Sequence, residues 1–147
     1  MREILVRAKN KYNEWVYGDV IFENVPLIAQ HNKNSLEVHT ILEDTLGQFS
    51  GVLDSNGDKI FEGDIVRMSY TGKNLGVNGT AEVVFQNGKF GVIWGWHKEL
   101  VALDGFANTK IEVIGNVFDN SELLEENDDR TGSKTNISLI FAESEKA

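Results

Sequence analysis

The sequence predicts a mainly β protein, with an N-terminal β-rich subdomain, a small antiparallel barrel and a short C-terminal helix. Three observations predict this class: short apolar runs alternate with a period of two, two Asn-Gly pairs separate such runs, and glycines stand at the corners between them. The 147 residues, 41% of them hydrophobic, are enough for one compact domain with a small subdomain. We divide the chain into the subdomain (1–50), the barrel (51–118), and a helix with an acidic, partly flexible tail (119–147).

Two strands are predicted at the start of the chain. Glu3–Ala8 and Glu14–Phe22 are rich in β-formers, and Gly18 interrupts the second run, where we expect a bend. Several basic side chains accompany these strands, and we interpret them as the charged guard of an exposed edge strand, with a phosphate site as the alternative. They are Arg2, Arg7, Lys9 and Lys11.

The next segment is less regular. Pro26, the only proline, is placed in a connection, because proline cannot donate to a strand ladder. Leu36–His39 reads as a third strand. Residues 40–50 stay ambiguous between a helical turn and a strand.

A hairpin is predicted between Ala81–Gln86 and Lys89–Trp94. The two residues between them, Asn87 and Gly88, favour a type I′ turn, in which both central residues need positive φ. This turn sets Gln86 opposite Lys89 and places the apolar residues of both strands on one face, as a core-facing ladder requires.

Two further strands and a helix complete the second half. Gly63–Tyr70 and Lys110–Val117 have strand patterns, and a glycine-rich loop follows the first at 71–79. A short helix is predicted at 120–126, because it begins with capping residues and has acids in its first turn. A polar tail with a small apolar segment at 137–141 follows.

The stretch Asp54–Asp64 (DSNGDKIFEGD) admits two interpretations. As a calcium loop it supplies oxygen ligands at the first, third and fifth positions, but that motif needs glycine at the sixth and glutamate at the twelfth. Lys59 and Ile65 stand there instead. We therefore reject calcium and predict a hairpin in which Asn56 and Gly57 form the positive-φ pair.

Composition and motifs exclude several kinds of chemistry. The chain has no cysteine, its net charge is −9, and its three histidines (His31, His39 and His97) lack the close spacing of zinc ligands. No catalytic, metal or cofactor site is predicted; an approach of His31 and His39 across a loop, with Glu37, is the alternative for a metal. The glycines, asparagines and the acid at the corners are interpreted as turn residues; they are Asn56, Gly57, Gly63, Asp64, Asn87, Gly88, Gly115 and Asn116.

One polar-aromatic cluster is a candidate binding surface. Its residues are Trp94, Trp96, His97 and Glu99, with Trp15 as a third large ring. The rings either fill the barrel or line a groove for a peptide or a base. A hydrolase site assembled around His97, Glu99 and Asp104 is a remoter alternative.

The order of these motifs resembles the YopX family of phage and prophage proteins from Gram-positive bacteria. The resemblance runs from about Glu3 to Glu125, and DSNGDKIFEGDIV is its most characteristic run. The blocks that carry it are Ile4–Ala8, Glu14–Gly18, Gly47–Gly51, Asp54–Val66 and Glu112–Leu124.

The resemblance implies an SH3-like barrel after the N-terminal part, self-association into a homo-oligomer, and no enzymatic activity. We expect a non-enzymatic module that binds a phage or host protein or itself, and keep a nucleic-acid-interacting accessory protein as the alternative. The acidic balance disfavours general nucleic-acid binding. We expect a cytoplasmic location, because the start lacks a signal-like apolar region and no run is long enough to span a membrane.

Overall fold

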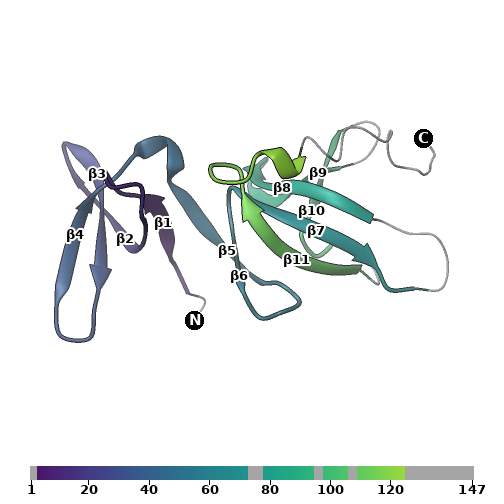
Figure 1. The fold of residues 1–147 in the computed structure, drawn as a ribbon, viewed down its shortest axis with the longest axis horizontal. Helices are drawn as coiled ribbons and strands as arrows, with labels where there is room; N and C mark the ends of the chain where they lie inside the picture. The colour runs from purple at the N-terminus through teal and green to yellow at the C-terminus, as the bar shows by residue number, and fades with distance from the viewer. Residues whose placement is uncertain (1–2, 73–77, 95–97, 106–108, 125–147) are drawn as a thin grey trace. The chain divides into compact units, whose positions relative to one another are not determined.

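The computed structural model describes residues 3–72, 78–94, 98–105 and 109–124 (Figure 1). The elements are β1 (Val6–Lys9), β2 (Trp15–Glu23), β3 (Val25–His31), β4 (Leu36–Thr40), η1 (Glu43–Thr45), β5 (Gly47–Leu53), β6 (Lys59–Phe61), β7 (Asp64–Tyr70), β8 (Asn78–Gln86), β9 (Lys89–Trp94), β10 (Glu99–Ala102) and β11 (Thr109–Asn116). The strands form two antiparallel sheets, in the orders β4-β3-β2-β1-β5-β6 and β10-β9-β8-β7-β11. The predicted mainly β class is confirmed.

The chain divides into two compact units, Met1–Val52 and Leu53–Ala147, called here the N-terminal and C-terminal units. None of the helical segments within the described ranges has the length and hydropathy of a membrane-spanning helix.

In the N-terminal unit, β2 pairs with two different strands along its length. Its first part pairs with β1, ending at the pair Val6–Gly18, and its second part pairs with β3, beginning at Asp19–Ala29. Strand β1 also pairs with β5, so it lies inside the sheet. The interpretation of β1 as an exposed edge strand is therefore wrong.

Gly18 stands where β2 changes partner, and it fits there because it has no side chain. A β-carbon built at this position would overlap the carbonyl oxygen of Ala29 and lie 2.8 Å from its carbonyl carbon. Real β-carbons do not come within 3.0 Å of such atoms. Gly18 is thus required by a close approach of two backbones, a different reason from the bend that the sequence suggested.

Two segments that the sequence left open or misplaced are ordered. Pro26 lies in strand β3 opposite Phe22 rather than in a connection. It is the second residue of the strand, next to the turn, where a missing N–H is tolerated. Residues 40–50 contain both a helical turn, η1, and the start of β5.

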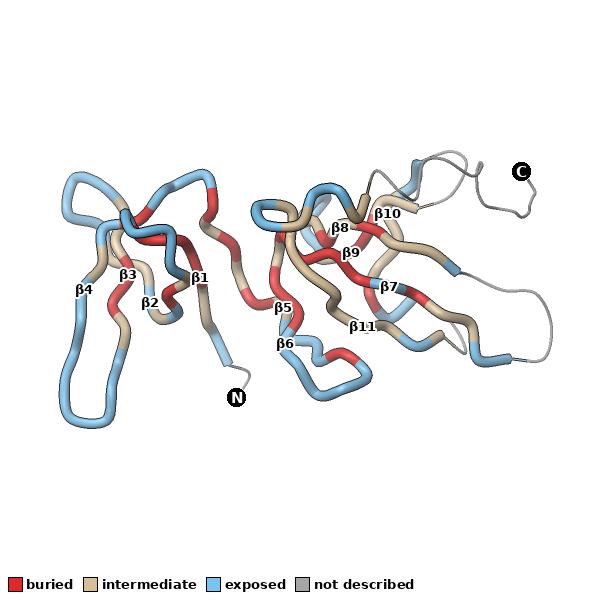
Figure 2. The backbone as a smooth tube through the Cα atoms, in the orientation of Figure 1, coloured by how far each residue is buried: buried red, intermediate tan, exposed pale blue. Residues whose placement is uncertain are grey.

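The core of the N-terminal unit lies on one face of its sheet. Ala8, Val16, Ile28 and Ile41 form one buried cluster, against which Val6 and Leu46 pack. Figure 2 shows the contrast along the unit: β1 is mostly buried, whereas β4 is exposed over most of its length.

In the C-terminal unit the hairpin of β8 and β9 has the predicted register. Asn87 and Gly88 have φ of 53° and 77°, and Gln86 pairs with Lys89. The core comprises Ile60, Val66, Met68, Ala81, Val83, Val92 and Leu103. The rings of Phe85 and Phe90, paired across the strands, lie 4.8 Å apart.

Strands β7 to β11 of this unit form an open sheet. Among the described strands β10 pairs with β9 and β11 with β7, and no ladder joins β10 to β11. The predicted closed barrel is therefore not found. Residues 122–124 are helical and follow the non-helical Asn120 and Ser121, whereas the end of the predicted helix and the tail lie outside the described residues.

Candidate functional site

The basic residues of β1 are buried and stacked on an aromatic ring. Arg7 and Lys9 are 7% and 5% exposed, and each lies over the ring of Trp15, at 4.6 Å and 5.5 Å from its centroid. Cations over an indole face are attracted by its quadrupole. This stack holds the two cations inside the fold, so it explains why lysine and arginine occur on an interior strand.

The residues of the candidate surface belong to different units. Trp94 packs partly buried against the core of the C-terminal unit and pairs with exposed Glu99 across β9 and β10, whereas Trp15 belongs to the N-terminal unit. Trp96 and His97 lie outside the described residues. Asp104 is exposed in the turn after β10.

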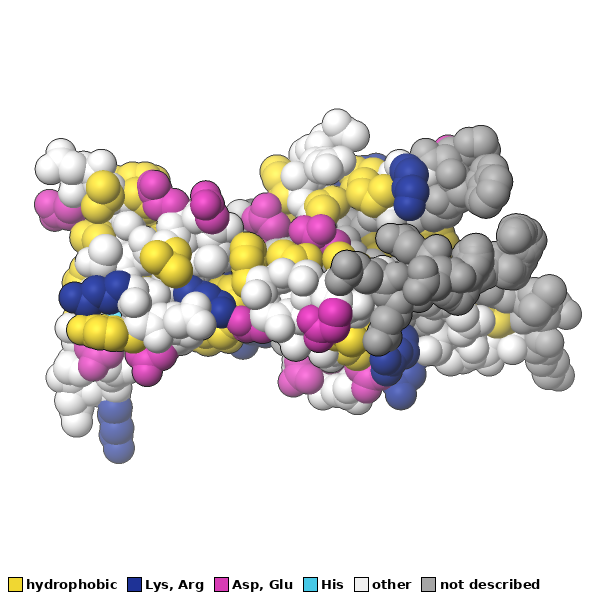
Figure 3. Space-filling view, turned by 45° about the horizontal axis from the view of Figure 1, so that its top comes forward, with side chains coloured by type: hydrophobic (Ala, Val, Ile, Leu, Met, Phe, Trp, Pro, Cys, Tyr) yellow, Lys and Arg dark blue, Asp and Glu magenta, His cyan; other side chains and the backbone are white. Residues whose placement is uncertain are grey.

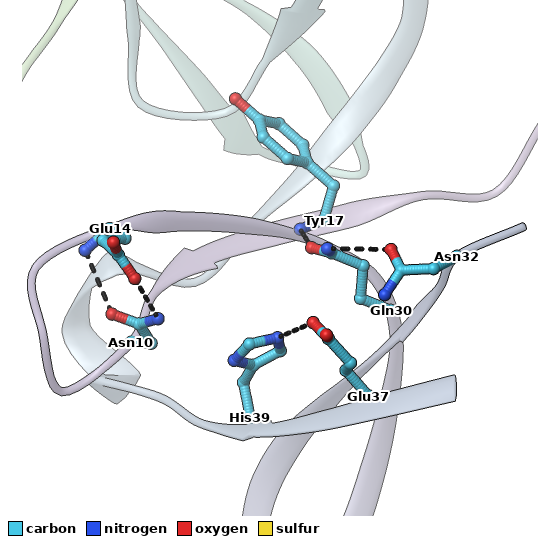
Figure 4. Close-up of polar contacts among 7 residues, drawn as sticks. All are labelled: Asn10, Glu14, Tyr17, Gln30, Asn32, Glu37 and His39. Atoms are coloured by element: carbon cyan, nitrogen blue, oxygen red, sulfur yellow. Dashed lines mark hydrogen bonds and ion pairs between the residues drawn. The ribbon is translucent and has the colours of Figure 1, made fainter. Parts of the chain in front are cut away.

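The histidines of the N-terminal unit do not form a joint site. His31 pairs with Leu36 and His39 with Ile28, so their side chains lie on opposite faces of the β3–β4 pair. His31 contacts Asp19 at 3.5 Å, and His39 Nε2 lies 3.3 Å from Glu37 Oε1 (Figure 4). No group of three or more potential metal ligands is found within the ranges that the structure describes.

The DSNGD loop, Asp54–Asp58, is held by the carboxylate of its first residue. Asp54 is 7% exposed; its Oδ1 accepts N–H bonds from Asn56 and Asp58 (2.9 and 2.8 Å), and its Oδ2 accepts one from Val113 on β11 (2.9 Å). Burial alone raises the pKa of Asp54, but the amides of Val113, Asp58, Asn56 and Gly57 lower it by more, so the pKa lies below its ordinary 3.8. The oxygens that a cation would need are engaged with backbone amides.

The turn in this loop differs from the predicted one. Gly57 has a φ of 85°, but Asn56 does not have positive φ. The N–H of Asp54 bonds to the carbonyl of Asp58, and that of Gly57 to the carbonyl of Asp54, which describes a three-residue loop. The register shifts because the Asp54 side chain, absent from the type I′ argument, organises the loop.

The other predicted turn residues have structural contacts. Asp64, 2% exposed, accepts an N–H bond from Phe61 at 2.7 Å, and the preceding Gly63 has a φ of 92°. The Asn116 side chain accepts the N–H groups of Phe118 and Asp119. Gly115 follows an irregularity in the β7–β11 ladder.

Two acids lie close together at the start of the β7–β8 region. Burial, and secondarily the charge of Glu62, raise the pKa of Glu82 above its ordinary 4.5. A carboxylate with a raised pKa destabilises the folded state once the pH exceeds its unfolded value, and this penalty is absent below it. The pair is therefore a local source of instability at neutral pH.

We expect Glu82→Gln to increase the free energy of unfolding at pH 7 by less than about 1 kcal/mol, since the carboxylate keeps part of its solvent contact. The gain is expected to vanish near pH 4. Urea unfolding at both pH values measures it, with Glu99→Gln as a control at an exposed position. An equal gain at both pH values would contradict the assignment to charge.

The outermost strand of the N-terminal unit offers the clearest free surface. Strand β4 follows β3 at the end of the sheet order, and among the described strands it has no second neighbour (Figure 1). Leu36 and Val38 on this strand are 54% and 53% exposed. The sequence predicted the strand but gave no sign that it lies at the edge, because strand order depends on long-range pairing.

Polar contacts, drawn in Figure 4, tie the strands next to this edge together. The side chain of Gln30 on β3 accepts the N–H of Tyr17 at 3.2 Å and donates to Asn32 at 3.4 Å. In the β1–β2 turn, the amide of Asn10 accepts the N–H of Glu14 and donates to its carboxylate. These contacts stabilise the sheet in which β4 is the last strand.

Residues 6–125 match the model of a family described as YopX protein. Among solved structures, the crystal structure of protein EF1440 from Enterococcus faecalis is similar over 84% of this chain and 99% of that one. The TM-score is 0.50 and the sequence identity 19%, so this likeness concerns the fold alone. The comparison with curated proteins gives no match.

Proposed function

The chain belongs to the YopX family, and from that premise we propose that it is a non-enzymatic phage or prophage protein that binds another protein, or itself, through β4. We place it in the cytoplasm of the bacterial host. The observation that carries the proposal is the edge position of β4 together with its exposed Leu36 and Val38. An exposed sheet edge is a template on which another strand can add.

The composition of β4 supports this role. Protein edges are commonly protected by lysine, proline or a bulge, and the segment LEVHT has none of these. Its ladder with β3 is regular from Leu36 to Thr40. Its one acid is Glu37, so the edge has little protection against strand addition, which favours a binding role.

A pull-down from the host bacterium during phage induction tests the proposal. We expect wild-type protein and a Tyr12→Lys control to capture the same partner, and Val38→Lys to lose it, because an edge lysine blocks strand addition. Tyr12, 71% exposed, lies in the β1–β2 turn of the same unit. Capture that is equal for all three baits would contradict binding at β4.

Nucleic-acid binding is the weaker alternative. Arg7 and Lys9 are buried on Trp15, and on the face drawn in Figure 3 the described lysine and arginine side chains form no continuous patch. Binding driven by phosphates needs accessible cations. We expect no change in fluorescence anisotropy of labelled duplex DNA or single-stranded RNA at low ionic strength; binding that weakens with added salt would revive the alternative.

A further inference from the structure

The side chains of β4 are arranged so that the strand is complementary to itself. Alternation places Leu36, Val38 and Thr40 on one face and Glu37 and His39 on the other. The only acid and the only histidine of the strand thus share a face, symmetrically on either side of Val38. The contact between Glu37 and His39 within one chain shows that both side chains reach over that face (Figure 4).

We propose that β4 pairs antiparallel with β4 of a second copy of this chain, with Val38 opposite the partner's Val38. In this register Glu37 faces His39 of the partner subunit, and the contact occurs twice because a two-fold axis relates the copies. On the other face Leu36 lies opposite Thr40 of the partner subunit. The inference rests on the proposed function and names the partner as a second copy.

Other registers lose this complementarity. In an antiparallel pair centred on Glu37, Glu37 faces its own copy, and in one centred on His39, His39 does. A parallel pair in register sets both residues against their own copies. Like groups directly opposite one another destabilise a strand pair, whereas opposite ones stabilise it. Pairing Val38 with His39 of the partner subunit would instead set the apolar face of one strand beside the polar face of the other, so that the apolar side chains would no longer meet.

The test measures dimerisation of the full chain by sedimentation equilibrium. Wild-type protein is expected to dimerise, and His39→Glu to raise the dissociation constant about tenfold, because two carboxylates then face each other at both contacts. Adding Glu37→Lys to that variant places a lysine opposite a glutamate at both contacts, so the double variant is expected to dimerise like the wild type. Val38→Lys is expected to weaken the dimer at least about tenfold, and Tyr12→Lys to leave it unchanged.

Because Glu37 and His39 also contact each other within one chain, His39→Glu sets two carboxylates together there too, and Glu37→Lys removes that repulsion. Urea unfolding of each variant therefore accompanies the dimer measurement and separates pairing from damage to the fold. Circular dichroism checks that each variant keeps its β content. A monomeric wild type, a dimer insensitive to both His39→Glu and Val38→Lys, or absence of rescue overturns the proposal. If wild type is monomeric but still captures a partner that Val38→Lys loses, the second-copy inference fails while the proposed function stands.

Discussion

Replacing Gly18 with alanine is expected to destabilise the N-terminal unit by about 3 kcal/mol. The added β-carbon would overlap the Ala29 carbonyl, and this neighbour is backbone within the β2–β3 ladder, which cannot move without breaking pairs. Because the obstacle is not a flexible side chain, relaxation by a rotamer change cannot relieve it. The cost is therefore expected to exceed that of an ordinary glycine replacement in a strand.

Gly51→Ala is the matched control in the same unit. Gly51 has a φ of 87°, but no heavy atom lies within 4 Å of a β-carbon placed there. We expect only the backbone strain of about 1 kcal/mol. Urea unfolding measures the stability of both variants. Hydrogen exchange followed by mass spectrometry shows where protection is lost, and we expect the amides of β2 and β3 to lose protection only in Gly18→Ala. Equal costs for both variants would contradict the explanation by a close approach at position 18.

Asp54→Asn is expected to reduce the stability of the C-terminal unit at pH 7 by about 2–4 kcal/mol. The carboxamide keeps one acceptor oxygen, which can serve Asn56 and Asp58, but its NH₂ group would then face the N–H of Val113. A buried donor left without an acceptor loses its solvation without compensation. Asp58→Asn, at an exposed position of the same loop, is the control, with an expected effect within about 0.5 kcal/mol.

The pH dependence of this effect has a definite sign. The folded-state pKa of Asp54 lies below its ordinary value, so its carboxylate stabilises the fold above the unfolded pKa, and this contribution is lost as the pH falls through the folded pKa. The difference between wild type and Asp54→Asn should therefore be full at pH 7 and shrink below pH 3.8. A difference independent of pH would contradict the charge-based explanation.

Local patterns predicted the elements better than their partners. The Asn87-Gly88 hairpin could be predicted to the residue, because turn chemistry and alternation both act over short distances. Strand β3 was missed because Pro26 counted as a breaker, although a proline near a hairpin turn is tolerated. The DSNGD turn was predicted with the wrong type, since the Asp54 carboxylate that organises it reaches to β11.

The candidate surface depended most on information beyond the local sequence. A strand could be predicted at Leu36–His39, but its edge position follows from the order of six strands. From the sequence, Arg7 and Lys9 suggested an edge strand or a phosphate site. Their burial on Trp15 depends on the register between β1 and β2, which cannot be read from the composition. The charged residues therefore suggested exposure to solvent, whereas in the structure they lie against the ring of Trp15.

The ladder between β7 and β11 affects the order in which the two units fold during synthesis. Strands β1 to β4 pair with sequence neighbours and can form hairpins as soon as they leave the ribosome. Strand β11 pairs with β7 across the intervening β8, β9 and β10. We expect the C-terminal sheet to wait for nearly the whole described chain, so that a ribosome stalled before residue 109 would carry a folded N-terminal hairpin array and an Asp54 still lacking its β11 contact.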